Sequence, residues 1–169
     1  MYTSHGAFST SCYLPCPLRA PPIGLLGKVE ILERRVFTKF TKEQQNRIIK
    51  TQIANRDNQR YGTKGGNTTN DSVFLLSLEE MIKYFVDSGQ LRNKNPKSQH
   101  FIDDQYNSAR ITKGTNGEAR WWWLRSPGDR SSAVADVRSG GGAYVDDIRA
   151  NNDYSGVRPA LWLNLKQAI

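Results

Sequence analysis

The chain has few of the residues that carry nucleophilic and metal chemistry. It contains two cysteines and two histidines, and both cysteines, Cys12 and Cys16, lie near its start. A closed zinc site needs four ligands. A cysteine nucleophile needs a histidine beside it, and the domain that contains His100, residues 37–169, has no cysteine. Neither G-x-S-x-G nor G-x-x-x-x-G-K-[ST] occurs. We therefore expect a protein that is not an enzyme, with no catalytic residues, no metal centre and no cofactor.

Long apolar runs are also missing. No segment of about 18 apolar residues exists, so no membrane insertion is expected. The first 27 residues have no basic segment followed by an apolar one, because the prolines from Pro15 to Pro22 interrupt each apolar stretch. We expect no secretory signal in the chain as given and, by default, a cytoplasmic protein. Residues 1–36 are interpreted as an irregular or truncated leader, and residues 37–169 as one domain.

Acidic residues are scarce only in the first part of the chain. The net charge is +8, of which residues 1–66 carry +7, residues 67–120 carry none and residues 121–169 carry +1. A basic tail or helix face explains such an excess without a nucleic-acid groove. Nucleic acid is therefore not an expected partner.

Two capping boxes predict two helices. Thr41 with Gln44 predicts a helix that continues to about residue 54, and Ser77 with Glu80 predicts a second that ends at Gly89. The segment 55–71 between them has the composition of a surface loop, and "SVFLLS" is expected to be a short buried strand. The second helix carries an apolar stripe that predicts core packing, made of Leu78, Met81, Ile82, Phe85 and Val86.

The segment "WWWLRSPG", residues 121–128, is expected to be a core strand. Successive side chains on a strand point to opposite faces, so Trp121 and Trp123 would fill one layer and Trp122 another. We predict that residues 121–124 and 160–163 are strands of one sheet and that at least two of the three tryptophans are buried. Arg125 is expected to pair with an acid or cap backbone carbonyls. Structural roles are also expected for Arg158 and Trp162.

Residues 129–155 contain no Lys, Glu, Gln, Met or Trp. Each residue type present can be reached by changing the adenines of an asparagine codon, although tight hairpins also explain so many Ser, Gly, Asn and Asp residues. Tyr, Ser, Gly, Asn and Arg are the residues that fill antibody paratopes. We expect this interval to form a contiguous exposed surface that binds a ligand. The candidate binding residues are Asp129, Arg130, Ser131, Arg138, Tyr144, Asp146, Asp147, Arg149, Asn151, Asn152, Asp153 and Tyr154.

Several motifs in a fixed order give the chain a family resemblance. "FTKFTKEQQNRIIKT", "YGTKGGN", "VFLLSLEEMIKYF" and "WWWLRSPG … SGVRPALWLNL" resemble a bacterial family of unknown function with the hallmark W-W-L-R-S-P-G … G-V-R-P-A-L, over roughly residues 37–165. The resemblance implies an α+β, loop-rich fold of the C-type-lectin-like kind, similar to formylglycine-generating enzymes, in which two helices pack on short antiparallel strands.

The same resemblance implies a function. Proteins of this wider group include the variable ligand-binding proteins of diversity-generating retroelements, and the interval that matches their diversified repeat is 129–155. The implied ligand is a protein or glycan on a cell or phage surface. Two alternatives stay open: a calcium-assisted lectin that uses Asp146, Asp147 and Asp153, and an enzyme related to formylglycine-generating enzymes. The redox cysteines of those enzymes have no counterpart in the C-terminal half.

Overall fold

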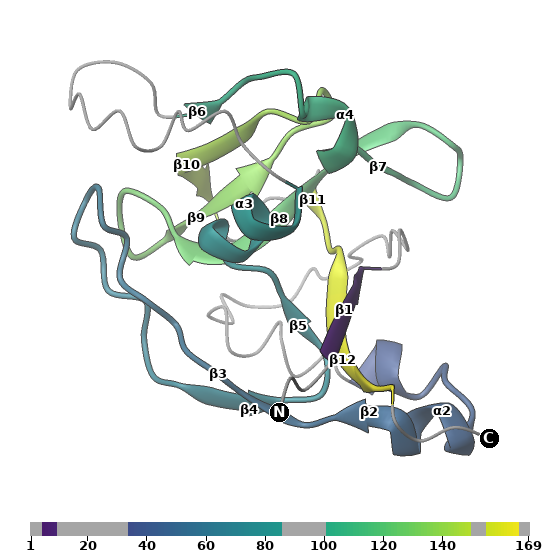
Figure 1. The fold of residues 1–169 in the computed structure, drawn as a ribbon. Coiled ribbons are helices and arrows are strands. Elements are labelled where there is room, and N and C mark those ends of the chain that lie inside the picture. Colours follow the sequence, from purple (N-terminus) through teal and green to yellow (C-terminus); the bar gives the residue numbers. More distant parts are fainter. Residues whose placement is uncertain (1–4, 10–33, 86–100, 150–154, 166–169) are drawn as a thin grey trace.

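The computed structural model describes residues 5–9, 34–85, 101–149 and 155–165 (Figure 1). These residues form mostly β-strands, and the helices among them are short. They are α2 (Lys42–Arg47), α3 (Leu78–Phe85) and α4 (Asn107–Arg110), and residues 34–37 are helical as well. The prediction of two helices packed on strands is wrong, because α2 buries none of its residues and, of the two helices predicted, only α3 packs on a sheet. The architecture of the described residues is that of antiparallel sheets joined by loops.

The largest sheet has six strands and holds most of the core. Its strand order is β11-β8-β9-β10-β6, and β7 pairs with the first two residues of β8. The neighbours are antiparallel except for β11 and β8. The strands are β6 (Phe101–Ile102), β7 (Thr112–Lys113), β8 (Ala119–Pro127), β9 (Ala133–Val137), β10 (Ala143–Arg149) and β11 (Ser155–Gly156).

A second sheet is built around the closing strand β12 (Figure 1). β12 pairs with β1 over five residues, and with β2 and β5 over two residues each. A third sheet consists of β3 and β4. The strands are β1 (His5–Ser9), β2 (Ile48–Ile49), β3 (Thr51–Ile53), β4 (Thr69–Asp71), β5 (Phe74–Leu75) and β12 (Pro159–Asn164).

These pairings, together with the burial of Val36, correct three predictions. The helix that starts at Thr41 has its predicted capping box but ends at Arg47, because Ile48 and Ile49 pair with β12 instead. The tryptophan strand and the closing strand lie in different sheets, since the described neighbours of β12 are β1, β2 and β5, and those of β8 are β7, β9 and β11. Residues 1–36 are not irregular throughout, because β1 belongs to the second sheet and Val36 is buried.

Two core clusters lie on opposite faces of β8, as the alternation of its side chains predicts. Trp122 and Leu124 belong to the first core cluster, whereas Trp123 belongs to the second and Trp121 is partly buried against it. Trp122 is 0% exposed and Trp123 is 2% exposed, so the prediction that at least two tryptophans are buried is confirmed. Burying side chains of this size contributes several kcal/mol to stability.

Helix α3 covers the first core cluster. Its capping box is present: the backbone N of Glu80 donates to Ser77 Oγ at 3.1 Å, and the backbone N of Ser77 donates to Glu80 Oε2 at 3.0 Å. Met81 is buried, and Leu78, Ile82 and Phe85 pack against the cluster, while the predicted members Val86 and Gly89 lie outside the described residues.

Candidate functional site

The interval 129–155 does not form one exposed surface, so that part of the prediction is wrong. All five residues of β9 are buried, and Val145 and Ile148 of β10 are also buried. The reason is topological: β9 lies between β8 and β10 in the middle of the six-stranded sheet, and its side chains enter core clusters on both faces. The candidate residues Asn151, Asn152, Asp153 and Tyr154, and the side chain of Asp147, lie outside what the structure describes.

The other candidates form two groups at opposite ends of β9. The turn from β8 to β9 carries the exposed residues Asp129, Arg130 and Ser131. Arg149 lies at the same end of β9, because it pairs with Ala133, the first residue of that strand. Arg138 and Tyr144 lie at the other end, where β9 turns into β10. A five-residue strand spans about 17 Å, so one small ligand could not contact both groups.

The first group, which we call the turn patch, consists of Asp129, Arg130, Ser131, Asp146, Arg149 and Tyr61. Arg130 Nη1 donates to both carboxylate oxygens of Asp129 at 2.9 Å, and the backbone N of Asp129 donates to the carbonyl of Asp146 at 2.7 Å. Burial, and then the negative charges of Asp146 and Asp129, raise the pKa of Tyr61 above its usual range. Much of the charge in this patch is therefore already paired within the protein.

The second group is an aromatic ladder, defined here as Phe101, Tyr144, Arg138 and Trp121. The rings of Phe101 and Tyr144 stack with centroids 5.3 Å apart and planes 24° apart. The guanidinium carbon of Arg138 lies 3.8 Å from the Tyr144 centroid and 4.4 Å from the Trp121 centroid. The sheet register explains this order, because Tyr144 pairs with Phe101, and the pairing of Trp122 with Val137 places Trp121 opposite Arg138. All four side chains are half-buried.

Arg138 is held in place by three neighbours, Trp121, Tyr144 and Asp136. Its guanidinium lies between two aromatic rings, which is a favourable cation–π arrangement. Its Nε lies 3.7 Å from an oxygen of Asp136, which is fully buried, while the side chain of Arg138 is 32% exposed. No described residue accepts a hydrogen bond from its Nη1 or Nη2. The ladder thus presents a fixed cationic donor between aromatic edges.

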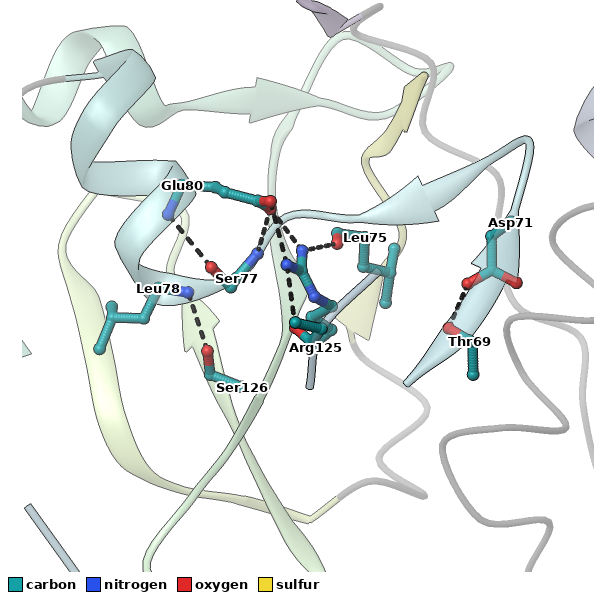
Figure 2. A network of polar contacts seen from close by, with 9 residues as sticks. Thr69, Asp71, Leu75, Ser77, Leu78, Glu80, Arg125 and Ser126 are labelled. Carbon is teal, nitrogen blue, oxygen red and sulfur yellow. Dashed lines mark hydrogen bonds and ion pairs between the residues drawn. The ribbon is translucent and has the colours of Figure 1, made fainter. Parts of the chain in front are cut away.

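Arg125 lies at the centre of a separate polar network (Figure 2). Its Nη1 donates to the carbonyl of Leu75 at 2.8 Å, its Nη2 to that of Ala54 at 3.5 Å, and both donate to the carboxylate of Glu80. Capping of backbone carbonyls by Arg125 was predicted and is confirmed. The network also ties the six-stranded sheet to α3, since the backbone N of Leu78 donates to Ser126 Oγ at 2.9 Å.

Arg158 and Trp162 also have structural roles. Arg158 donates from Nη1 to the carbonyl of Arg110 at 3.3 Å, and its guanidinium lies 4.4 Å from the Phe85 ring and 5.1 Å from the Trp122 ring. Burial lowers the pKa of Arg158. Trp162 packs against the first core cluster and stacks on Phe74.

Asn58 is a buried anchor that the sequence did not reveal. Its Nδ2 donates to the carbonyls of Pro127 at 2.8 Å, Val145 at 3.0 Å and Gly128 at 3.3 Å. Its Oδ1 accepts from the backbone N of Arg60 at 2.9 Å and of Tyr61 at 3.2 Å. The loop 55–68 is therefore fastened to the six-stranded sheet, although nothing in its composition distinguishes Asn58 from the neighbouring asparagines.

Within the described residues, no group of three or more His, Cys, Asp or Glu side chains could hold a metal ion. Of the three aspartates proposed for calcium, the side chain of Asp147 and the whole of Asp153 lie outside the described part. The described helices include none that is long and apolar enough to cross a membrane.

One family model matches the chain, over residues 30–165; its description is Domain of unknown function (DUF6273). The chain belongs to this family. No curated protein and no solved structure matches it. The DUF6273 match starts at residue 30, so it includes the last part of the segment interpreted above as a leader, in agreement with the burial of Val36.

Proposed function

We propose that this chain is a non-enzymatic ligand-binding domain and that the aromatic ladder is its main contact surface. The observation that carries the proposal is the position of Arg138, fixed between Trp121 and Tyr144 with its Nη groups available to a ligand. Trp, Tyr and Arg dominate the energetics of protein interfaces. Stacking orders the arginine before the ligand arrives, which lowers the entropic cost of binding.

The geometry of the ladder favours one kind of contact. Because β10 lies between β9 and β6, Arg138 and Phe101 flank Tyr144 from its two neighbouring strands, and both contact its ring. A ligand therefore meets ring edges and guanidinium N–H groups. Carboxylate and carbonyl oxygens are the complementary groups, since bonds from a charged donor are the stronger ones. The ligand that we propose is a protein or glycan on a cell or phage surface that presents such oxygens.

Diversification of residues 129–155 remains part of this proposal, but only some positions could vary. A polar or bulky substitution in buried β9 would disrupt the core. Among the described residues, the positions open to change are those that are exposed or half-exposed, namely Asp129, Arg130, Ser131, Ser132, Arg138, Ser139, Gly140, Gly142, Tyr144, Asp146 and Arg149. A reverse transcriptase gene and a near-copy of the 3′ coding region in the neighbouring DNA would support diversification, and their absence would contradict it.

The binding proposal is tested with the labelled chain on arrays of glycans and of surface proteins. For any ligand captured, Tyr144→Ala and Arg138→Gln should each weaken binding by about 1–3 kcal/mol, roughly 5- to 150-fold in Kd. Arg149→Ala is the matched control, because Arg149 is an exposed residue of the same strand at the turn-patch end. Equal losses for Arg149→Ala and Tyr144→Ala would move the site away from the ladder, and conversion of the ligand into a product would refute the non-enzymatic proposal.

A further inference from the structure

The aromatic ladder offers hydrogen-bond donors to a ligand, while the acceptor beside it is buried. Arg138 contributes the N–H groups of Nη1 and Nη2, Trp121 contributes an indole N–H, which only donates, and Tyr144 contributes a hydroxyl. No described residue forms a hydrogen bond with any of these groups. The carboxylate beside them belongs to Asp136, which is 0% exposed. The exposed part of the ladder therefore has unused donors and little capacity to accept.

Within the Arg138 side chain, the donors that a ligand can reach are those of the two Nη atoms. Nε is buried and lies 3.7 Å from an oxygen of Asp136. The side chain as a whole is 32% exposed, and neither Nη atom is among the buried polar atoms that lack a hydrogen bond. The protein's own carboxylate thus lies at the Nε edge of the guanidinium, and the Nη atoms stay accessible.

The neighbouring rings fix the direction from which a ligand reaches these donors. The guanidinium carbon lies 3.8 Å from the Tyr144 centroid. An N–H group pointed at the ring would hold that carbon farther away, so the guanidinium lies flat on the ring. Trp121 contacts it from β8, the neighbouring strand on the other side, with its centroid 4.4 Å from the same carbon. A ligand therefore approaches Nη1 and Nη2 in the plane of the guanidinium, between two ring edges.

The group that suits this approach is a carboxylate. Nη1 and Nη2 belong to one rigid plane, and two parallel N–H bonds from them match the two oxygens of a carboxylate. A carboxylate only accepts hydrogen bonds, as the donors of the ladder require. The edges of aromatic rings carry positive partial charge, so Trp121 and Tyr144 also favour a negative charge between them.

A neutral sugar suits the ladder less well. Its hydroxyl groups donate as well as accept, and the exposed part of the ladder gives them little to donate to. A sugar also uses the face of an aromatic ring, on which it lays its C–H groups. Arg138 lies over the Tyr144 ring, and Phe101 stacks on the same ring with centroids 5.3 Å apart. The carboxylates of a protein are therefore a better match than the hydroxyl groups of a glycan.

We propose that the aromatic ladder binds an aspartate or glutamate side chain of a partner protein, whose carboxylate is held by Nη1 and Nη2 of Arg138. This inference rests on the proposed function and narrows its ligand to one chemical group. A protein is the favoured source because Trp, Tyr and Arg dominate contacts between proteins. Aspartate and glutamate also carry the carboxylate on an unbranched arm that fits between two ring edges, whereas an acidic sugar carries it on a bulky ring.

The test is a titration of the ¹⁵N-labelled full chain with N-acetylglutamate methylamide, followed through the side-chain N–H signals of Arg138 and Trp121. The neutral control is N-acetylglutamine methylamide, which has nearly the same shape. The glutamate probe should shift both signals in a saturable manner and bind about tenfold more tightly than the glutamine probe, since a charged acceptor strengthens the hydrogen bonds. Methyl glucuronoside, an acidic sugar, should bind more weakly than the glutamate probe.

Two variants with the same substitution separate the ladder from a general attraction of acids to a basic protein. Arg138→Lys keeps the charge but loses the planar fork, so it should weaken binding of the glutamate probe about fivefold, measured on the Trp121 signal. Arg149→Lys makes the same change at an exposed arginine of β10, at the turn-patch end, and should bind the probe as the wild type does. If Arg138→Lys fails to fold, the three probes on the wild-type chain decide.

The proposal is overturned if the ladder signals do not shift, if the glutamine probe binds as tightly as the glutamate probe, or if the glucuronoside binds more tightly. Normal binding by Arg138→Lys would overturn it as well. None of these results refutes the proposed function, which fails instead if a ligand captured on the arrays binds Arg138→Gln and Tyr144→Ala as it binds the wild type.

Discussion

Replacing Glu80 by glutamine should destabilise the protein by about 1–3 kcal/mol. The Glu80 carboxylate accepts from the backbone N of Ser77 and from both Nη atoms of Arg125. Glutamine offers one oxygen for these donors, and its amide nitrogen would face the guanidinium. Arg125, whose side chain is 9% exposed, would then lack its counterion in a position from which water is largely excluded.

The chain contains a matched control, a second glutamate that pairs with an arginine of β8. Glu118 pairs with Arg120 at 2.8 Å, and Glu118→Gln also removes one carboxylate that faces an arginine of β8. The side chains of that pair are 66% and 38% exposed. Pairs in such positions typically contribute about 0–1 kcal/mol, because solvent screens both charges. The two substitutions are chemically identical, and the two sites differ in burial and in the capping bond that Glu80 also accepts from Ser77.

The measurement is unfolding by urea and by heat, followed by tryptophan fluorescence, which reports on the buried Trp122 and Trp123. For a chain of this length about 1 kcal/mol lowers Tm by about 2–4 °C, so Glu80→Gln should lower it by roughly 2–12 °C and Glu118→Gln by less than about 4 °C. Near-ultraviolet circular dichroism checks that each variant keeps its tertiary packing. Equal losses from the two variants would refute the argument from burial.

Three further predictions concern other parts of the fold. Trp122→Ala should cost about 3–5 kcal/mol in the same unfolding assay, and Trp121→Ala clearly less, because Trp121 is only partly buried. Asn58→Asp should lower the free energy of unfolding by about 3 kcal/mol or more at neutral pH, since a carboxylate would face the three carbonyls to which Asn58 donates. This destabilisation should be smaller in acid, where the carboxyl group is protonated. Burial, and then the charge of Asp146, raise the pKa of Tyr61 above the usual tyrosine value of about 10, so stability falls as the pH rises through its folded pKa. Asp146→Asn should lower that pKa in part, because burial remains, and an ultraviolet titration with Tyr61→Phe as the reference measures the change.

The features that the sequence predicted well depend on neighbouring residues. Both capping boxes are present, because a cap needs only a hydroxyl and a carboxylate or amide three positions apart. The alternation of Trp121, Trp122 and Trp123 between two core clusters follows from the geometry of any extended chain. The role of Arg125 could be predicted from chemistry, because an arginine beside a buried tryptophan run needs hydrogen-bond acceptors.

The features that were predicted wrongly depend on distant pairing. Ile48, Ile49 and Ile53 have helical spacing, yet the first two pair with β12 and the third belongs to a sheet with β4. β-Branched residues accept either state, and the available strand partners decide. Nothing local indicates which strand will be central, so the burial of all of β9 could not be foreseen from its small and polar neighbours.

The same limit applies to the candidate site. Composition predicts Arg138 and Tyr144 as binding residues, whereas the alternation along the tryptophan strand predicts a core position for Trp121, and no sequence pattern distinguishes Phe101. The sheet order β8-β9-β10-β6 brings these four residues side by side, although they span 44 positions of the sequence. A binding surface that crosses several strands takes one or two residues from each strand, whereas a contiguous interval on a central strand consists mostly of core residues. A binding surface on this fold is therefore better sought by register across the sheet than by composition along the chain.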